Sequence, residues 1–281
     1  MSSASADNQR VHFRFLKFQV ALLLAIAIVS AIDWQLFPIY RTFSIIAALG
    51  LIGLTFLQLF GQIQKYDRKW FASRAVAESV KVQTWRFMMK VSPYDSSDAS
   101  SACNQFVEDV LQMLKEQQDA KLVAGSKPVQ GKEVSQFMLD QREKSIIERR
   151  DFYVKDRIDD QQNWYSKKAT WNSKQYGRWT IATFGLQAGS GIIALMTFVF
   201  PGSPFNPVGV LTTLAISGIS WMNARGYREL SQSYGLIAHD LSGFQSVAEE
   251  ANDQGRLEKL VSNVESRISG EHTYWKARRL Y

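Results

Sequence analysis

Hydroxyl and amide side chains recur along two otherwise apolar stretches, and they are the residues of this chain best suited to contact water or ions. At about 100° per residue, the members of each stretch fall on one face of a helix. They are Thr183, Gln187, Ser190 and Thr197 in the first stretch, and Thr213, Ser217 and Ser220 in the second. Two polar rows on adjacent apolar helices predict a pore lining, because polar groups that face lipid are costly. The alternative is packing alone, in which hydroxyls bond their own helix and Gln187 bonds a neighbour.

Two glycines, Gly185 and Gly189, lie on the side of the first stretch opposite its polar row. They stand inside an apolar run, so a loop that cradles phosphate is not indicated. Small residues four positions apart let two membrane helices approach closely. The pair therefore predicts a helix-packing site.

Residues that bind metals or catalyse reactions do not cluster along the sequence. The three histidines, His12, His239 and His272, are not within metal-ligand spacing of one another or of Cys103. No nucleophile stands at a recognisable spacing from a base. We therefore expect no enzyme, no metal and no cofactor. Basic helices close to a membrane also favour anionic headgroups over nucleic acid as partners.

The positions of the charged residues divide the chain into very apolar and very polar parts. The 281 residues carry a net charge of +7, and their mean hydropathy of −0.17 is the value of a soluble protein. However, 18–32, 42–64 and 179–224 contain no charged residue, and an apolar run of about 20 residues can cross a bilayer. The proline-rich segment 201–207 divides the third stretch by a turn. We predict four transmembrane helices, at 18–37, 42–60, 179–200 and 208–223, paired as two hairpins.

Basic residues flank the predicted spans almost entirely on one side. Arg41 is the only basic residue in the two turns that connect paired spans. The positive-inside rule then predicts that both termini and the segment 61–178 lie in the cytoplasm. An alternative interpretation of residues 10–31 is a cleaved signal peptide, since basic residues precede an apolar run with small residues at its end. Its removal would leave three spans.

The charged parts of the chain are predicted to be helical. The expected helices are 61–92, 99–121, 135–177, 225–251 and 257–279. The apolar spacing in 135–177 fits either a coiled-coil-like stalk or an amphipathic helix packed on its neighbours. Gly235, Gly243 and Gly270 weaken the prediction of the last two helices. We predict an all-α membrane protein with four transmembrane helices as two hairpins and long cytoplasmic helices. A linker at 125–134 would separate domains 1–124 and 135–281.

Two motifs rich in aromatic and basic residues carry a resemblance to a known family. The first follows the first hairpin and comprises Trp70, Arg74, Ala77, Glu78, Lys81, Trp85 and Arg86. The second precedes the second hairpin and comprises Glu148, Arg149, Tyr153, Arg157, Gln161, Trp164, Tyr165, Lys168 and Ala169. With Glu271, His272 and Trp275 near the C-terminus, these motifs resemble two units of the SLATT membrane proteins.

The resemblance implies a bacterial inner-membrane effector of antiphage or conflict systems that forms a pore when a nucleotide signal is sensed. We expect a homo-oligomer in contact with membrane lipid, activated by a nucleotide second messenger or a nucleotide-sensing partner protein. The expected coupling residues are Trp70, Arg74, Glu78, Trp85, Arg157, Gln161 and Trp164. Static helix packing is the alternative for each of them.

Two other functions compete with the pore. A non-conducting membrane scaffold would recruit partners through its charged helices. A small-solute transporter is disfavoured, because the centres of the predicted spans lack the ionisable residues that coupling sites need.

Overall fold

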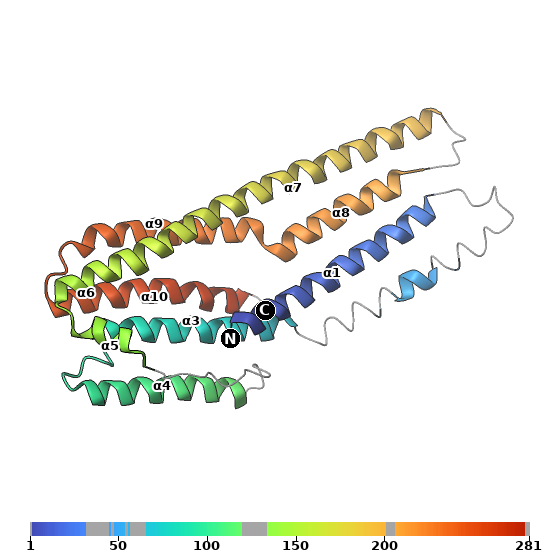
Figure 1. The fold of residues 1–281 in the computed structure, drawn as a ribbon. Coiled ribbons are helices and arrows are strands. Elements are labelled where there is room, and N and C mark those ends of the chain that lie inside the picture. The colour runs from blue at the N-terminus through green and yellow to red at the C-terminus, as the bar shows by residue number, and fades with distance from the viewer. Residues whose placement is uncertain are drawn as a thin grey trace. The chain divides into compact units, whose positions relative to one another are not determined.

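The computed structural model describes residues 2–31, 45, 48–53, 56, 66–119, 134–200 and 206–278 (Figure 1). Its elements are α1 (Ser2–Ser30), α3 (Tyr66–Met88), α4 (Ala99–Asp119), α5 (Gln136–Glu143), α6 (Ile146–Tyr153), the π-helix η2 (Val154–Asp159), α7 (Asp160–Val199), α8 (Val208–Arg225), α9 (Tyr227–Ala248) and α10 (Gln254–Arg278). No strand occurs among these residues, which confirms the all-α prediction.

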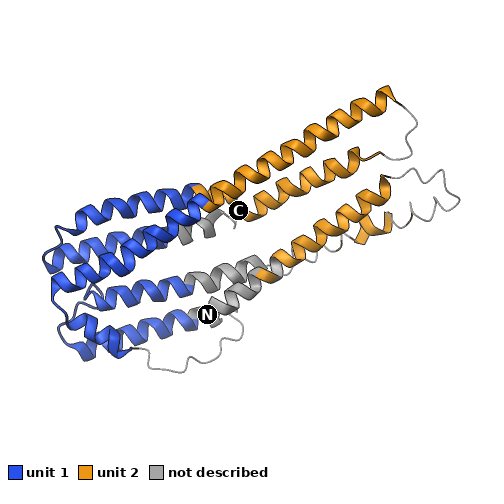
Figure 2. Cartoon of the chain, turned by 45° about the horizontal axis from the view of Figure 1, so that its top comes forward, with its two compact units in different colours: residues 1–8, 67–170, 232–281 blue, residues 9–66, 171–231 orange. Residues whose placement is uncertain are grey.

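The chain divides into two compact units, each built from separate stretches of sequence (Figure 2). Unit 1 comprises Met1–Asn8, Asp67–Thr170 and Gln232–Tyr281. Unit 2 comprises Gln9–Tyr66 and Trp171–Ser231. Each unit therefore draws on both predicted domains, 1–124 and 135–281, and that sequence division stays a prediction. The linker 125–134 lies outside the described residues except for its last position.

Unit 2 holds the apolar stretches. Two helices of the described residues are long and apolar enough to cross a membrane, with qualifying segments at Phe13–Ser30 and within Ile146–Val199. The first overlaps the predicted span 18–37 over residues 18–30, and the second helix contains most of the predicted span 179–200. The fourth predicted span forms α8, which is not one of the two. The second predicted span, 42–60, lies mostly outside the described residues. Four spans therefore stay a prediction.

Unit 1 is held by apolar faces with helical spacing. In α4, Phe106 and Val110 lie four positions apart on one face of the helix and are both buried. The ring of Phe106 lies 5.1 Å from that of Phe87 at the end of α3. In α10, Leu257, Val261, Val264 and Ile268 are buried. The glycines that weakened the prediction of α9 and α10 do not interrupt either helix.

In unit 2, Gly226 separates α8 from α9. It adopts φ 62°, a left-handed conformation that favours glycine, and its N–H donates to the carbonyl of Met222 over 2.9 Å. This caps α8 and lets α9 begin at Tyr227.

The single helix predicted over 135–177 is wrong. Lys144 is extended, with ψ 159°, and ends α5. Ser145 then begins α6 with a capping box, in which its hydroxyl accepts from the N–H of Glu148 and the Glu148 side chain accepts from the N–H of Ser145. Because both capping partners satisfy N–H groups that a continuous helix would satisfy itself, the break occurs without Gly or Pro. Ile147, in the first turn of α6, is 53% exposed.

Candidate functional site

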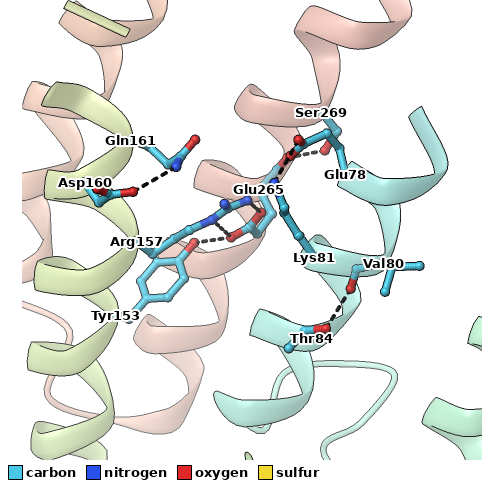
Figure 3. Close-up of polar contacts among 10 residues, drawn as sticks. All are labelled: Glu78, Val80, Lys81, Thr84, Tyr153, Arg157, Asp160, Gln161, Glu265 and Ser269. Carbon is cyan, nitrogen blue, oxygen red and sulfur yellow. Dashed lines mark hydrogen bonds and ion pairs between the residues drawn. The ribbon is translucent and has the colours of Figure 1, made fainter. Parts of the chain in front are cut away.

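A buried ion pair lies at the centre of unit 1 (Figure 3). Arg157 donates from Nε to Glu265 Oε1 over 2.9 Å and from Nη2 to Oε2 over 2.7 Å. The Tyr153 hydroxyl donates to Glu265 Oε1 over 2.9 Å. Glu265 and Tyr153 are fully buried and Arg157 is 3% exposed. The three side chains connect α6 and η2 to α10.

The π-helical turn of η2 explains how Arg157 reaches this position. Arg149, Tyr153 and Arg157 are buried at intervals of four, whereas Ile158, Tyr165 and Asn172 are buried at intervals of seven. The two series are out of register by one residue, which is the residue that a π turn adds. Arg157 and Ile158 can therefore both face the interior. Such turns are rare and often mark functional sites.

The surroundings of the ion pair shift the pKa values of Arg157 and Tyr153. Burial alone would lower the pKa of Arg157, but the hydrogen bonds and charge of Glu265 outweigh it, so the pKa of Arg157 is raised. Burial, followed by the charge of Glu265, raises the pKa of Tyr153 well above its usual range. Both groups therefore stay protonated at neutral pH. Removing one partner from a buried pair costs about 3–5 kcal/mol, because the other charge is left uncompensated.

Two further buried arginines hold the turn after α3. Arg142 donates to the carbonyls of Phe87 and Ser96, each over 2.8 Å. Arg149 donates to the carbonyl of Met89 over 2.5 Å. The turn contains Lys90 with φ 53°, and its N–H donates to the carbonyl of Phe87 over 3.2 Å. Buried arginine side chains therefore add to the backbone hydrogen bonds of this turn.

The predicted coupling residues fall into separate places. Trp85 joins the ion pair, with its ring 5.5 Å from that of Tyr153 and 6.0 Å from the guanidinium of Arg157. The charge of Glu78 also contributes to the raised pKa of Arg157, although the side chain itself pairs with Lys81 over 3.0 Å.

The other predicted coupling residues lie elsewhere. Gln161 donates to Asp160 over 3.3 Å, and Trp164 packs against Tyr234 of α9 with ring centroids 5.5 Å apart. Trp70 and Arg74 lie in α3, and their side chains are outside the described residues. Glu265 and Tyr153 were not among the predicted coupling residues.

In unit 2, three of the seven residues predicted to line a pore are buried. Thr183 donates to the carbonyl of Trp179 in its own helix over 2.9 Å. Ser190 Oγ lies 2.9 Å from Thr212 Oγ1 of α8. Ser217 is 7% exposed, and its hydroxyl has no partner among the described residues. In one chain, Thr183 and Ser190 serve the packing of α7 on α8, while the role of all three residues in a pore stays a prediction.

The remaining four residues are more accessible. Gln187 and Ser220 are exposed, and Thr213 is half-buried. Thr197 is also half-buried and donates to the carbonyl of Ile193 over 2.8 Å.

The close approach between α7 and α8 occurs at Gly218. A Cβ atom there would lie 2.6 Å from Thr183 Cγ2, so only glycine fits without a shift. By contrast, a Cβ at Gly185 or Gly189 would meet no described atom within 4 Å. The predicted glycine pair is therefore not a packing site within the described part of the chain.

Two protein-family models match the chain, one in each half. Residues 1–150 match the family model described as SMODS and SLOG-associating 2TM effector domain 3. Residues 153–275 match SMODS and SLOG-associating 2TM effector domain 1. No curated protein and no solved structure matches the chain. Among the described residues, no group of three His, Cys, Asp or Glu side chains could hold a metal ion.

Proposed function

Because the chain belongs to the SLATT family of SMODS and SLOG-associating 2TM effectors, we propose that it is a membrane effector that forms a pore between copies of itself. Its place would be the bacterial inner membrane, with several spans and with both termini in the cytoplasm. In this role the protein catalyses no reaction and takes no cofactor.

The observation that carries the proposal is the exposure of Gln187 and Ser220 on otherwise apolar helices. A polar side chain that faces lipid is unfavourable, so an assembly that encloses these two residues is favoured. Thr183 and Ser190 already pack against α8 within one chain, and this supports a lumen between copies rather than inside one copy.

The opposite face of α7 supports contact between copies. Ile181 is 75% exposed and Ile192 is 59% exposed. Gly185 and Gly189 belong to this apolar face and have no described neighbour at their Cβ positions. In lipid, small residues let helices associate through close packing, and a second copy of α7 would fit this face.

Gating would use the buried pair at η2. Arg157 lies in the π turn, and α7 continues without interruption from Asp160 to Val199. Loss of the Arg157–Glu265 contact would allow the π turn to become α-helical, which turns the following helix by about 100°. Two discrete packings of this kind are the usual basis of a switch.

The signal would be a nucleotide second messenger or a nucleotide-sensing partner protein. The names of both matching domains, which associate them with SMODS and SLOG, support this origin.

Dye or ion release from liposomes that contain the purified full chain tests the proposal. Nucleotide second messengers should trigger release by the wild type. Gln187→Leu should reduce that release, because it removes a polar group from the lining. Asn163→Leu is the matched control, since this exposed amide lies in α7 but belongs to unit 1.

A failure of the assay also has a defined meaning. Oligomers that pass neither ions nor dye under any nucleotide tested would contradict the pore and leave the non-conducting scaffold. The packing of Thr183 and Ser190 between α7 and α8 favours that alternative.

A further inference from the structure

Two cations and two aromatic rings gather where α1 and α8 meet in unit 2. The guanidinium carbon of Arg225 lies 3.8 Å from the ring centroid of Phe13 and 5.0 Å from that of Trp221. Lys17 Nζ lies 5.8 Å from the ring centroid of Trp221. The two rings meet edge to face at 5.6 Å. We define Phe13, Lys17, Trp221 and Arg225 as the basic aromatic cluster.

The cations of this cluster are not neutralised within the described part of unit 2. No hydrogen bond or ion pair of Arg225 is found there, and its Nε atom is buried without a partner. Glu229 is the single carboxylate of the described residues of unit 2. Seven basic residues accompany it: Arg10, Arg14, Lys17, Lys174, Arg178, Arg225 and Arg228. Such an excess of positive charge makes this part of the chain attractive to an anionic ligand.

The depth of the cluster in a membrane follows from the two helices. At the far end of α1, the carbonyl of Ala31 accepts from the N–H of Asn206, over 2.9 Å, just before α8 begins. From Phe13 to Ala31 a helix rises about 27 Å, which is close to the hydrocarbon thickness of about 30 Å. The basic aromatic cluster therefore lies at headgroup level, where Trp, Lys and Arg are favoured.

We propose that the basic aromatic cluster binds the phosphate of an anionic phospholipid headgroup. The Arg225 guanidinium contacts both rings and makes no side-chain hydrogen bond to a described residue, so we assign its N–H groups to phosphate oxygens. Lys17 is exposed and adds a second charge. The apolar segment Phe13–Ser30 offers a surface for the acyl chains. The site rests on the membrane placement of unit 2 in the proposed function, but not on conductance.

Lipid retention tests the site without any flux measurement. The full chain is reconstituted into phosphatidylcholine bilayers that contain a minor fraction of phosphatidylglycerol, and the lipid that stays bound after extraction is quantified. The wild type should retain phosphatidylglycerol preferentially. Lys17→Gln and Arg225→Gln should each reduce this preference about five-fold, the effect of one basic residue near an anionic surface. Arg178→Gln, an exposed cation of α7 outside the cluster, should leave it unchanged.

Three outcomes would overturn the proposal. The first is equal retention of phosphatidylglycerol by the wild type and Lys17→Gln. Because Lys17 is exposed, this substitution should not affect folding. An equal loss in Arg178→Gln would show that charge acts anywhere on the surface. Inorganic phosphate could also be added to the protein in phosphatidylcholine bilayers. If it raised the melting temperature as much as phosphatidylglycerol does, the site would belong to a free anion. Preferential retention without conductance would leave the site intact and contradict only the pore.

Discussion

Arg157 and Glu265 form a bidentate ion pair although they lie 108 residues apart in the sequence. The pair joins a π turn to the C-terminal helix α10 and is almost completely removed from water. Tyr153 adds a third hydrogen bond to the same carboxylate. The carboxylate therefore has a donor on each oxygen, which is the condition under which a buried pair is tolerated.

Single substitution of the ion pair should be more damaging than replacement of both partners. Arg157→Met or Glu265→Leu leaves a buried charge alone and should destabilise the protein by about 3–5 kcal/mol. The double variant should recover most of that loss, since two apolar side chains can pack together. Thermal and denaturant unfolding of the purified protein measure both effects. Additive losses in the double variant would show that the two residues act independently.

Tyr153 should make stability depend on alkaline pH. Its folded pKa is raised by burial and by Glu265, so its stabilising effect is complete below the unfolded pKa of about 10 and falls as pH rises above it. Tyr153→Phe should cost about 1–3 kcal/mol at neutral pH through the lost hydrogen bond. The difference in stability between the two proteins should shrink above pH 10. A difference that stays constant would contradict the burial of an uncharged tyrosine at this site.

Gly218 should tolerate no side chain. Gly218→Ala forces a Cβ against Thr183 Cγ2 and should destabilise the contact of α7 with α8 by about 1–3 kcal/mol. Thr183→Ser removes that methyl group, so the double variant should regain stability. Unfolding measurements in detergent provide the comparison, with Thr183→Ser alone as the control.

Gly185→Ala is the matched change on the exposed face of α7. It meets no described atom and should leave monomer stability unchanged, while weakening the proposed contact between copies. A Gly218→Ala variant as stable as Gly185→Ala would contradict the packing of α7 on α8.

The sequence predicted the helices from periodicity, charge and glycine or proline breaks, and it failed where side chains end a helix. Ser145 and Glu148 form a capping box that begins a new helix at Ile146. The break was not predicted because the segment contains no Gly or Pro. The residues of the first polar row were identified, yet their spacing did not reveal that Thr183 and Ser190 pack against α8. Whether a polar residue packs on a neighbouring helix or faces a lumen depends on that neighbour. The periodicity of one helix does not show it.

The sequence identified one partner of the ion pair and missed the other. Arg157 belongs to an aromatic and basic motif near Trp164, whereas Glu265 is isolated in α10. One signal was available: Glu265 stands next to Val264 and between Val261 and Ile268, on the apolar side of its helix. A carboxylate in such a position needs a buried cation, but the spacing does not say which one.

Conductance of a single-cysteine protein tests the pore most directly. Cys103→Ser removes the only native thiol, and Gln187→Cys then places one at an exposed polar position of α7. If α7 lines a lumen between copies, an aqueous charged thiol reagent should block the activated ion current of this protein. Ile192→Cys lies on the exposed apolar face, five positions from Gln187, and should react poorly and keep its current. Full modification of Gln187→Cys with an unchanged current, or an activated oligomer that carries no current, would contradict the account.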